Sequence, residues 1–413
     1  MPLIKILICY LSLLVVAQVS AQSIAYEQDI KPIISKNCIN CHREGEAGAM
    51  PLTNYEEVSA YGSMIQYVTQ ARLMPPWYAD TTYRHFSNER SMTPLEIDQI
   101  KRWVENGMPE GTPSKQTTLS TTVFTALRKP DVTISMLTAF EQYGIFMDQY
   151  QVFVLPIQFG EDKWIEGIEF MPGNKKIVRY ASISVDTSGQ SAALDQWDPR
   201  YGYYSFGGIG FTASQPYWYT WNLQQPTTFY PSGTAKRLPK NAKLILHIQY
   251  GPAGSPQLDS SSVRLYFSKQ KPKREIITSP LINPPTLISD SLFVPANTKK
   301  IFHASYTLPY DIEVMSLTPQ ANLICRSWEV YAKIPGEELA VKLLKIKDWN
   351  FTWKETYRFA SPIHLPQGTV IHAQALYDNT TDNPCNPSDR PVDIREGSHL
   401  FSELFFVHFE FLK

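Results

Sequence analysis

The chain has 413 residues, of which 43% are hydrophobic and 19% charged, a balance that suits a folded protein with a core and excludes a disordered one. Its 38 basic and 39 acidic residues leave a formal charge of -1, so the charge balance indicates no nucleic acid, anionic membrane or polyanionic substrate as a partner. A single core rarely serves a chain of this length, and the many aromatic residues and prolines favour short strands over long helices. We therefore expect several units that are mostly β.

The N-terminus has the features of a secretory signal peptide. Lys5 precedes an apolar run that ends at Ala17, and small residues lead to a cleavage site at Ala21. The apolar run is too short to span a bilayer comfortably, and no second apolar stretch of spanning length follows. We expect removal of residues 1–21, no transmembrane anchor after that cleavage, and a periplasmic or extracellular protein in an oxidising compartment.

The sequence Cys38-Ile-Asn-Cys41-His42 is the attachment signature of a c-type haem. Two thiols add to the vinyl groups of the porphyrin, and the adjacent imidazole then lies where it can bind the iron. A structural disulfide and a thioredoxin-like redox pair are the alternatives, but the redox pair requires a βαβ context and a helical pattern precedes this motif. We expect one covalent haem c on Cys38, Cys41 and His42, attached by haem attachment machinery.

Two further helices are expected after the motif. Thr53 and Glu56 form a capping box ahead of apolar residues at helical spacing, and Thr93 and Glu96 form a second one. Residues 24–113 are therefore predicted to form three helices around one haem.

The iron of a low-spin c-type haem usually takes a methionine sulfur opposite the histidine. The candidates in this segment are Met50, Met64, Met74, Met92 and Met108. Met50 follows His42 so closely that it would have to cross to the opposite haem face quickly, and Met64 lies within a helical pattern. Met74 is favoured because the two prolines that follow it fix an extended loop, with Trp77 as an aromatic wall beside it.

Three stretches, residues 37–42, 72–77 and 103–107, resemble the cytochrome c modules that precede copper type II, ascorbate-dependent monooxygenase-like domains in secreted bacterial proteins. The resemblance covers residues 24–113. It implies a small all-α cytochrome c domain in which Met74 is the axial sulfur ligand.

The remainder of the chain alternates apolar and polar residues, as strands do. Residues 244–250 and 405–411 are the clearest cases. A polar linker is expected at 114–128, and a basic stretch with a proline at 269–274 is the best internal boundary. Two β-sandwiches of ordinary size follow from that boundary.

This part resembles the two-domain, copper-binding β-sandwich core of peptidylglycine and dopamine hydroxylases. The landmarks, in order, are Pro172-Gly173-Asn174, His247 to Pro252, Ser327-Trp328-Glu329, Tyr377 to Thr380 and Asn383-Pro384. The resemblance implies six copper-ligand positions, which here hold Arg179, Tyr180, Gln249, Gln320, Asn322 and Leu404. None of these residues offers the imidazole or thioether that copper requires in this chemistry, so copper is not expected. Outside the haem motif, no two histidines have the spacing of one strand face or one helix face.

The expected fold class is multidomain, with a small all-α cytochrome c domain followed by two β-sandwich, jelly-roll-like domains. The expected organisation is a signal peptide at 1–21, a cytochrome c-type haem domain at 24–113, a linker at 114–128, and monooxygenase-like β-sandwiches at 129–274 and 275–413. Cys325 and Cys385 remain after haem attachment and are expected to form a disulfide, with two buried free thiols as the alternative.

The sequence predicts an exported monohaem c-type cytochrome for electron transfer, whose degenerate, copper-less sandwich pair serves in binding or docking. Its redox partner protein is not identified, and no catalytic residue is assigned. The alternative is a haem-fed oxidoreductase of the copper type II, ascorbate-dependent monooxygenase type. A haem-based sensor is a third possibility, and it would require an open or weakly held distal position. An enzymatic role stays open, and the copper reaction is disfavoured.

Overall fold

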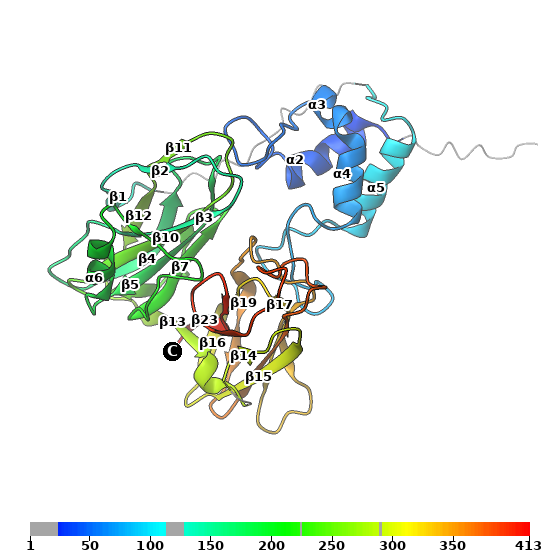
Figure 1. Cartoon of the computed structure of the whole chain (residues 1–413). Helices are drawn as coiled ribbons and strands as arrows, with labels where there is room; N and C mark the ends of the chain where they lie inside the picture. The colour runs from blue at the N-terminus through cyan, green and yellow to red at the C-terminus, as the bar shows by residue number, and fades with distance from the viewer. Residues whose placement is uncertain (1–23, 113–127, 224, 289–290) are drawn as a thin grey trace, which may run out of the picture.

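The computed structural model describes residues 24–112, 128–223, 225–288 and 291–413 (Figure 1). The chain is mostly β-sheet, and its helices are few and short. The predicted signal peptide lies outside the described residues, as does the predicted linker apart from Arg128.

Most helices come before the first strand. They are η1 (Tyr26–Ile30), α2 (Lys31–Asn37), α3 (Tyr55–Ala60), α4 (Gly62–Gln70) and α5 (Pro94–Glu105), with α6 (Gln190–Trp197) and η2 (Pro284–Thr286) further along the chain. The predicted start of α5 is confirmed, because Thr93 and Glu96 exchange both capping-box hydrogen bonds. The capping box predicted at Thr53 and Glu56 is wrong. Asn54 caps α3 by accepting from the backbone N–H of Glu57, and the Glu57 carboxylate accepts from the backbone N–H of Thr53 at 2.6 Å.

The predicted small all-α cytochrome c domain is wrong. The longest helix before residue 113 is α5, with 12 residues, and no distinct all-α unit forms there. The physical reason lies in the loop between α4 and α5. Trp77, Ala79 and Phe86 of that loop are buried in the core of the last β-sheets, so the loop packs on strands and the N-terminal helices do not form a unit of their own. The Phe86 ring, for example, stacks on Phe359 with the ring centroids 5.6 Å apart.

The β part is sandwich-like, with two smaller sheets packed on one nine-stranded sheet (Figure 1). The nine-stranded sheet has the order β1 (Val132–Ser135), β12 (Ser262–Phe267), β4 (Lys163–Met171), β9 (Thr234–Leu238), β13 (Arg274–Ile282), β23 (Phe406–Leu412), β16 (Ile312–Gln320) and β19 (Tyr357–Leu365), with β8 (Thr228–Phe229) beside β4. The five-stranded sheet has the order β6 (Tyr203–Tyr204), β3 (Gln149–Val154), β10 (Lys243–Tyr250), β5 (Val178–Asp186) and β7 (Gln215–Asn222). The four-stranded sheet has the order β15 (Lys299–Thr307), β20 (Val370–Asp378), β17 (Cys325–Lys333) and β18 (Val341–Ile346). Short ladders pair β2 (Phe140–Gln142) with β11 (Gln257–Asp259), and β21 (Ile394–Glu396) with both β14 (Phe293–Val294) and β22 (Ser402–Glu403).

Each smaller sheet shares a hydrophobic core with its part of the nine-stranded sheet. We call strands β1–β12 the first sandwich and strands β13–β23 the second sandwich. The strands predicted from alternation are confirmed. Leu246 of β10 lies in the first core, opposite Val263 and Leu265 of β12. Phe409 and Phe411 of β23 lie in the second core.

The two sandwiches share a sheet at the predicted internal boundary. The stretch 269–274 ends where β13 begins, and β13 pairs in parallel with β9, with Arg274 opposite Thr234. Lys236 of β9 is 1% exposed, and its Nζ lies 2.6 Å from Glu410 Oε1 of β23. A buried ion pair therefore crosses the boundary.

Replacing Lys236 with Met is expected to destabilise the protein by about 3 kcal/mol, because it removes the buried cation that pairs with the Glu410 carboxylate. The matched control is the double variant Lys236→Met with Glu410→Gln, which removes both charges and should recover most of the loss. Urea unfolding of the three proteins measures both effects. A double variant as unstable as Lys236→Met alone would contradict the ion-pair explanation.

His408 of β23 is a buried imidazole with neither ring nitrogen hydrogen-bonded to a described residue. Its ring lies against Tyr217, with the centroids 4.4 Å apart. Burial lowers the pKa of His408 from 6.5 to about 3. Between those values the unfolded chain binds a proton that the folded chain does not, so stability falls as pH falls through this range.

His408→Phe should therefore match the wild type at pH 7.5 and exceed it at acid pH. The expected gain is about 1.4 kcal/mol for each pH unit below 6.5. Urea unfolding at pH 7.5 and pH 5 measures it, with the exposed His85→Gln variant as the control. Equal pH dependence in the wild type and His408→Phe would show that His408 does not cause the acid destabilisation.

The predicted disulfide between Cys325 and Cys385 is wrong. Both are unbonded thiols; Cys325 is buried in β17, and Cys385 is exposed in a loop. The two cysteines were paired only by elimination, and a cysteine count carries no distance between them.

Candidate haem site

The haem motif follows directly on α2. The backbone N–H of Cys38 still donates to the carbonyl of Ile34, and the N–H groups of Cys41 and His42 donate to the Cys38 carbonyl at 3.2 and 3.0 Å. The chain thus turns once more after the helix ends. This turn brings the two thiols and the imidazole of the motif to one cavity.

The imidazole of His42 has a fixed orientation. Its Nδ1 lies 3.0 Å from the carbonyl oxygen of Met50. A carbonyl only accepts, so Nδ1 carries the proton and Nε2 keeps its lone pair for a metal. Gly48 permits this approach, because a Cβ there would lie 2.7 Å from His42 Nδ1.

We call the cavity at the motif the haem cavity. Its volume is about 400 Å³, within the usual range for sites of small molecules and cofactors. It is lined by Asn37, Cys38, Cys41, His42, Ala47, Gly48, Ala49, Met50, Leu52, Met64, Ile65, Val68, Thr69, Met74, Pro75, Pro76, Arg179, Leu223 and Trp353. Most of these side chains are apolar, so the cavity fits a large hydrophobic ring with thioether attachment at one edge.

The five candidate methionines lie in two different places. Met50, Met64 and Met74 line the haem cavity, whereas Met92 and Met108 pack with the core of the N-terminal helices. Assignment of the axial position to Met74 stays a prediction. Trp77, expected as an aromatic wall beside Met74, lines a neighbouring space together with Met74, is absent from the lining of the haem cavity and packs edge-on against Tyr357.

Two observations on the Cys38 thiol bear on the alternatives to haem attachment. It forms no disulfide with any residue that the structure describes. Burial raises the pKa of Cys38 to about 12, whereas a thioredoxin-like pair requires a thiol with a lowered pKa.

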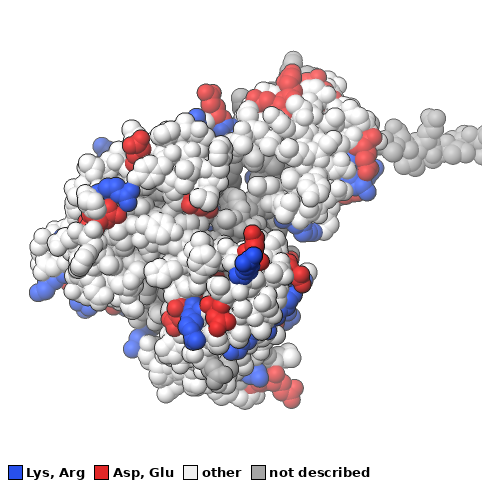
Figure 2. Space-filling model, viewed as in Figure 1, with Lys and Arg blue, Asp and Glu red and all other residues white. Residues whose placement is uncertain are grey.

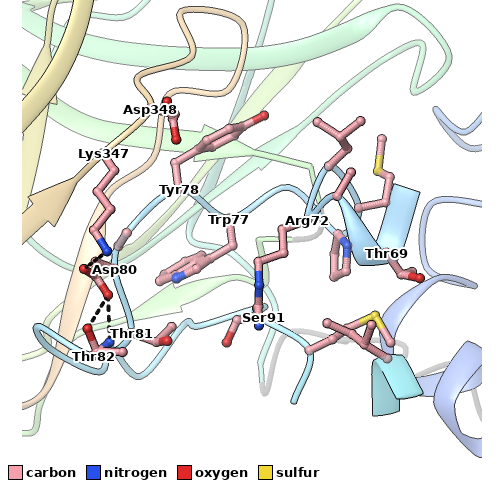
Figure 3. A pocket seen from close by; sticks show the side chains of 17 residues that line it. Thr69, Arg72, Trp77, Tyr78, Asp80, Thr81, Thr82, Ser91, Lys347 and Asp348 are labelled. Carbon is pink, nitrogen blue, oxygen red and sulfur yellow. Dashed lines mark hydrogen bonds and ion pairs between the residues drawn. The ribbon is translucent and has the colours of Figure 1, made fainter. Parts of the chain in front are cut away.

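Beside the haem cavity lies a second space of about 530 Å³, which we call the side cleft (Figure 3). The two spaces share Thr69, Met74 and Pro75. Figure 3 shows Arg72 next to Trp77 and Ser91 in the side cleft. At the other end of the cleft, Lys347 forms an ion pair with Asp80, with Nζ 2.8 Å from the carboxylate. The lining of the side cleft thus carries more polar and charged side chains than that of the haem cavity.

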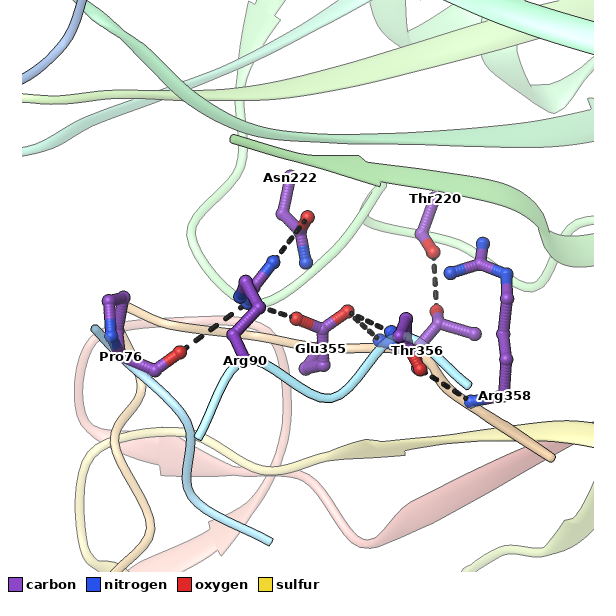
Figure 4. Close-up of polar contacts among 8 residues, drawn as sticks. Pro76, Arg90, Thr220, Asn222, Glu355, Thr356 and Arg358 are labelled. Carbon is purple, nitrogen blue, oxygen red and sulfur yellow. Dashed lines mark hydrogen bonds and ion pairs between the residues drawn. The ribbon is translucent and has the colours of Figure 1, made fainter. Parts of the chain in front are cut away.

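Arg90 joins the three parts of the molecule (Figure 4). From the loop before α5, its guanidinium donates to Asn222 Oδ1 of β7 at 3.4 Å and to Glu355 in the second sandwich. It also donates to the carbonyl of Pro76, which lines the haem cavity. These contacts tie the wall of the haem cavity to both sandwiches.

Most of the positions where the resemblance implies copper ligands are buried, and Arg179 and Leu404 are half-buried. Tyr180 of β5 stands opposite Gln249 of β10, whose Nε2 donates to Asp148 Oδ2 at 2.7 Å. In the second sandwich, the backbone N–H of Asn322 donates to Glu403 Oε2 at 2.8 Å, and the carbonyl of Leu404 accepts from the Tyr377 hydroxyl at 2.6 Å.

Lys354 lies between these two groups of residues. Its Nζ is 4.0 Å from the ring centroid of Phe351 and 5.7 Å from that of Tyr180. Burial lowers the pKa of Lys354 to about 7, and burial raises the pKa of Glu403 to about 8. The aligned positions thus share their surroundings with a buried lysine, which is unfavourable for a further cation. The expectation that copper does not bind stays a prediction.

Sequence spacing missed one pair of histidines. His303 of β15 and His372 of β20 lie on adjacent strands, with His303 Nε2 3.1 Å from His372 Nδ1. Within the described ranges, no three His, Cys, Asp or Glu side chains come together as metal ligands. The pair could not be recognised from spacing because its members are far apart in the sequence.

No family model matches the chain, and no curated protein matches it. Among solved structures, the chain is similar to PNGase F, a peptide:N-glycanase, with 13% identity over 68% of this chain and 96% of that chain and a TM-score of 0.26. It is similar to the major capsid protein P2 of bacteriophage PM2 with 9% identity, 68% and 96% coverage and a TM-score of 0.24. It is also similar to PNGF-II with 12% identity, 70% and 62% coverage and a TM-score of 0.23. TM-scores this low do not establish a shared fold.

Two surface properties bear on partners. On the face drawn in Figure 2, basic and acidic side chains occur in small mixed groups separated by uncharged surface. This face therefore has no large field of one sign to attract a polyanion. Among the helices of the described ranges, none is both long enough and apolar enough to cross a membrane.

Proposed function

We propose that the protein is an exported electron-transfer protein with one covalent haem c, attached to Cys38 and Cys41 and ligated by His42 and Met74. The observation that supports this proposal is that all four residues are among those lining the haem cavity, although Met74 is remote from the motif in sequence. A haem bound there would supply a one-electron redox centre.

The residues around the haem cavity would support that redox centre in three ways. The carbonyl of Met50 holds His42 so that Nε2 is available as a ligand. Apolar walls such as Ile65 and Val68 limit water around it. The contacts of Arg90 hold the loop that carries Met74 against the two sandwiches.

We further propose that the sandwich pair is a copper-less relative of the monooxygenase core and serves in binding or docking. The six aligned positions support this part of the proposal, because none of them carries an imidazole or thioether. The signal-like N-terminus supports export to the periplasm or beyond, where haem attachment machinery and a redox partner protein would act.

Metal analysis with an absorption spectrum of the purified mature protein tests the proposal. We expect one iron and no copper per chain, and a haem that stays with the polypeptide after acid-acetone extraction. Haem that is extracted would exclude a c-type protein. Stoichiometric copper beside the iron would favour the haem-fed oxidoreductase, and ready binding of carbon monoxide by the ferrous protein would favour the sensor.

A further inference from the structure

We propose that Arg179 of the first sandwich is the ion-pair partner of a haem propionate. The inference rests on the function proposed above and deepens it. It assigns to the first sandwich a part of the haem site, at a position where the hydroxylase resemblance implies a copper ligand.

The first observation is the charge of the cavity lining. Among the described residues that line the haem cavity, Arg179 is the only one with a permanent charge. Haem carries two carboxylates at the edge opposite its vinyl groups. Placing a carboxylate in an apolar cavity without a partner costs several kcal/mol, so a haem site of this kind needs a cation or water at that edge.

The second observation is that local backbone geometry aims Arg179 out of its strand. In the pairing of β10 with β5, Gln249 lies opposite Tyr180 and Tyr250 lies opposite Val178, so Arg179 is the extra residue of a β-bulge. Bulges re-aim side chains and are common beside functional sites. The neighbouring residue is Gly251, where a Cβ would lie 2.3 Å from Arg179 Nε. The passage for the Arg179 side chain therefore requires glycine at position 251.

The third observation is that the guanidinium keeps unused donors. Its Nη1 donates to the carbonyl of Ala47 at 3.0 Å, and it forms no ion pair with a residue in the described ranges. Two acidic groups act on it: the Cys41 thiol and Asp148, which already accepts from Gln249 and from the Tyr150 hydroxyl. A guanidinium has five N–H donors in a fork that matches a carboxylate.

The consequence is a measurable effect on the haem. Without the Arg179 charge, the propionate leaves an uncompensated negative charge near the iron, and that charge opposes the addition of an electron. Arg179→Gln removes the charge while keeping an N–H donor for the carbonyl of Ala47. Arg72→Gln is the matched control, because Arg72 lines the side cleft and is not part of the haem cavity lining.

The experiment measures the midpoint potential of the holoprotein at fixed pH, together with the propionate bending band in its resonance Raman spectrum. Arg179→Gln should lower the equilibrium constant for reduction at least tenfold, which is 59 mV for a one-electron couple, and should shift the band. Arg72→Gln should leave the band unchanged and should shift the potential by less than Arg179→Gln does. Arg179→Lys, which keeps a charge without the fork, should restore most of the potential while the band remains shifted.

A wild-type chain without covalent haem would overturn the proposed function and this inference with it. Haem in place, with Arg179→Gln unchanged in potential and band, would overturn this inference alone. A shift in Arg72→Gln equal to that in Arg179→Gln would also overturn it, because the effect would then not be specific to the haem cavity. If Arg179→Gln does not fold, Arg179→Lys decides, and an unshifted band in that variant counts against the ion pair.

Discussion

Replacing Cys38 and Cys41 together with Ala is expected to abolish covalent haem completely. Each thioether bond uses one of these thiols, and both line the haem cavity. The expected result is an exported chain with no haem peroxidase stain after denaturing electrophoresis, whereas the wild type stains.

The matched control replaces the other two cysteines of the mature chain. Cys325 and Cys385 lie away from the haem cavity, and neither is bonded. Cys325→Ala with Cys385→Ala should therefore keep full staining. Staining that persists in the Cys38 and Cys41 double variant, with export intact, would refute covalent attachment at this motif.

Replacing Met74 with Ala is expected to remove the weak sulfur-to-iron band at the red end of the ferric spectrum. The same change should lower the reduction potential by tenths of a volt, because axial-ligand identity sets haem potentials over a range of about 0.8 V. Optical titration of the wild type and the variant measures both.

Met50→Ala and Met64→Ala are the controls, since both sulfurs also line the haem cavity. Both variants should keep the band and a potential near that of the wild type. Survival of the band in Met74→Ala, with its loss in Met64→Ala, would move the axial role to Met64. Its loss only in Met50→Ala would assign Met50 instead.

Features encoded by neighbouring residues could be predicted from the sequence. The start of α5 depends on Thr93 and Glu96, which are three residues apart, and both capping bonds are present. The capping box predicted for α3 was wrong because two local bonds compete there. Glu57, four residues after Thr53, accepts the Thr53 N–H that the capping box would have given to Glu56.

The fold class was wrong because helix signals do not report where a loop packs. Trp77 and Phe86 follow α4 in sequence, and the two prolines before Trp77 predicted an extended loop with that ring beside Met74. In the structure they are buried against Tyr357 and Phe359 of β19. Burial partners so distant in the sequence leave no mark in local periodicity or capping.

The candidate site likewise contains residues that the sequence identifies and residues that it does not. Cys38, Cys41 and His42 are adjacent in the chain, so one motif identifies them together. The walls contributed by Leu223 and Trp353 come from two different sandwiches. Nothing in the spacing of those residues relates them to the motif, and the same applies to the contact between His303 and His372.

The parallel pairing of β9 with β13 determines whether either sandwich could exist as a separate protein. A chain cut before β13 would expose one side of β9 as a bare edge, ready to pair with another molecule. It would also leave Lys236 without Glu410, which lies on β23 near the far end of the sequence. Recombination that exchanged one sandwich for a foreign one would break both the sheet and the charge balance. The pair should therefore be inherited, and should unfold, as one indivisible unit.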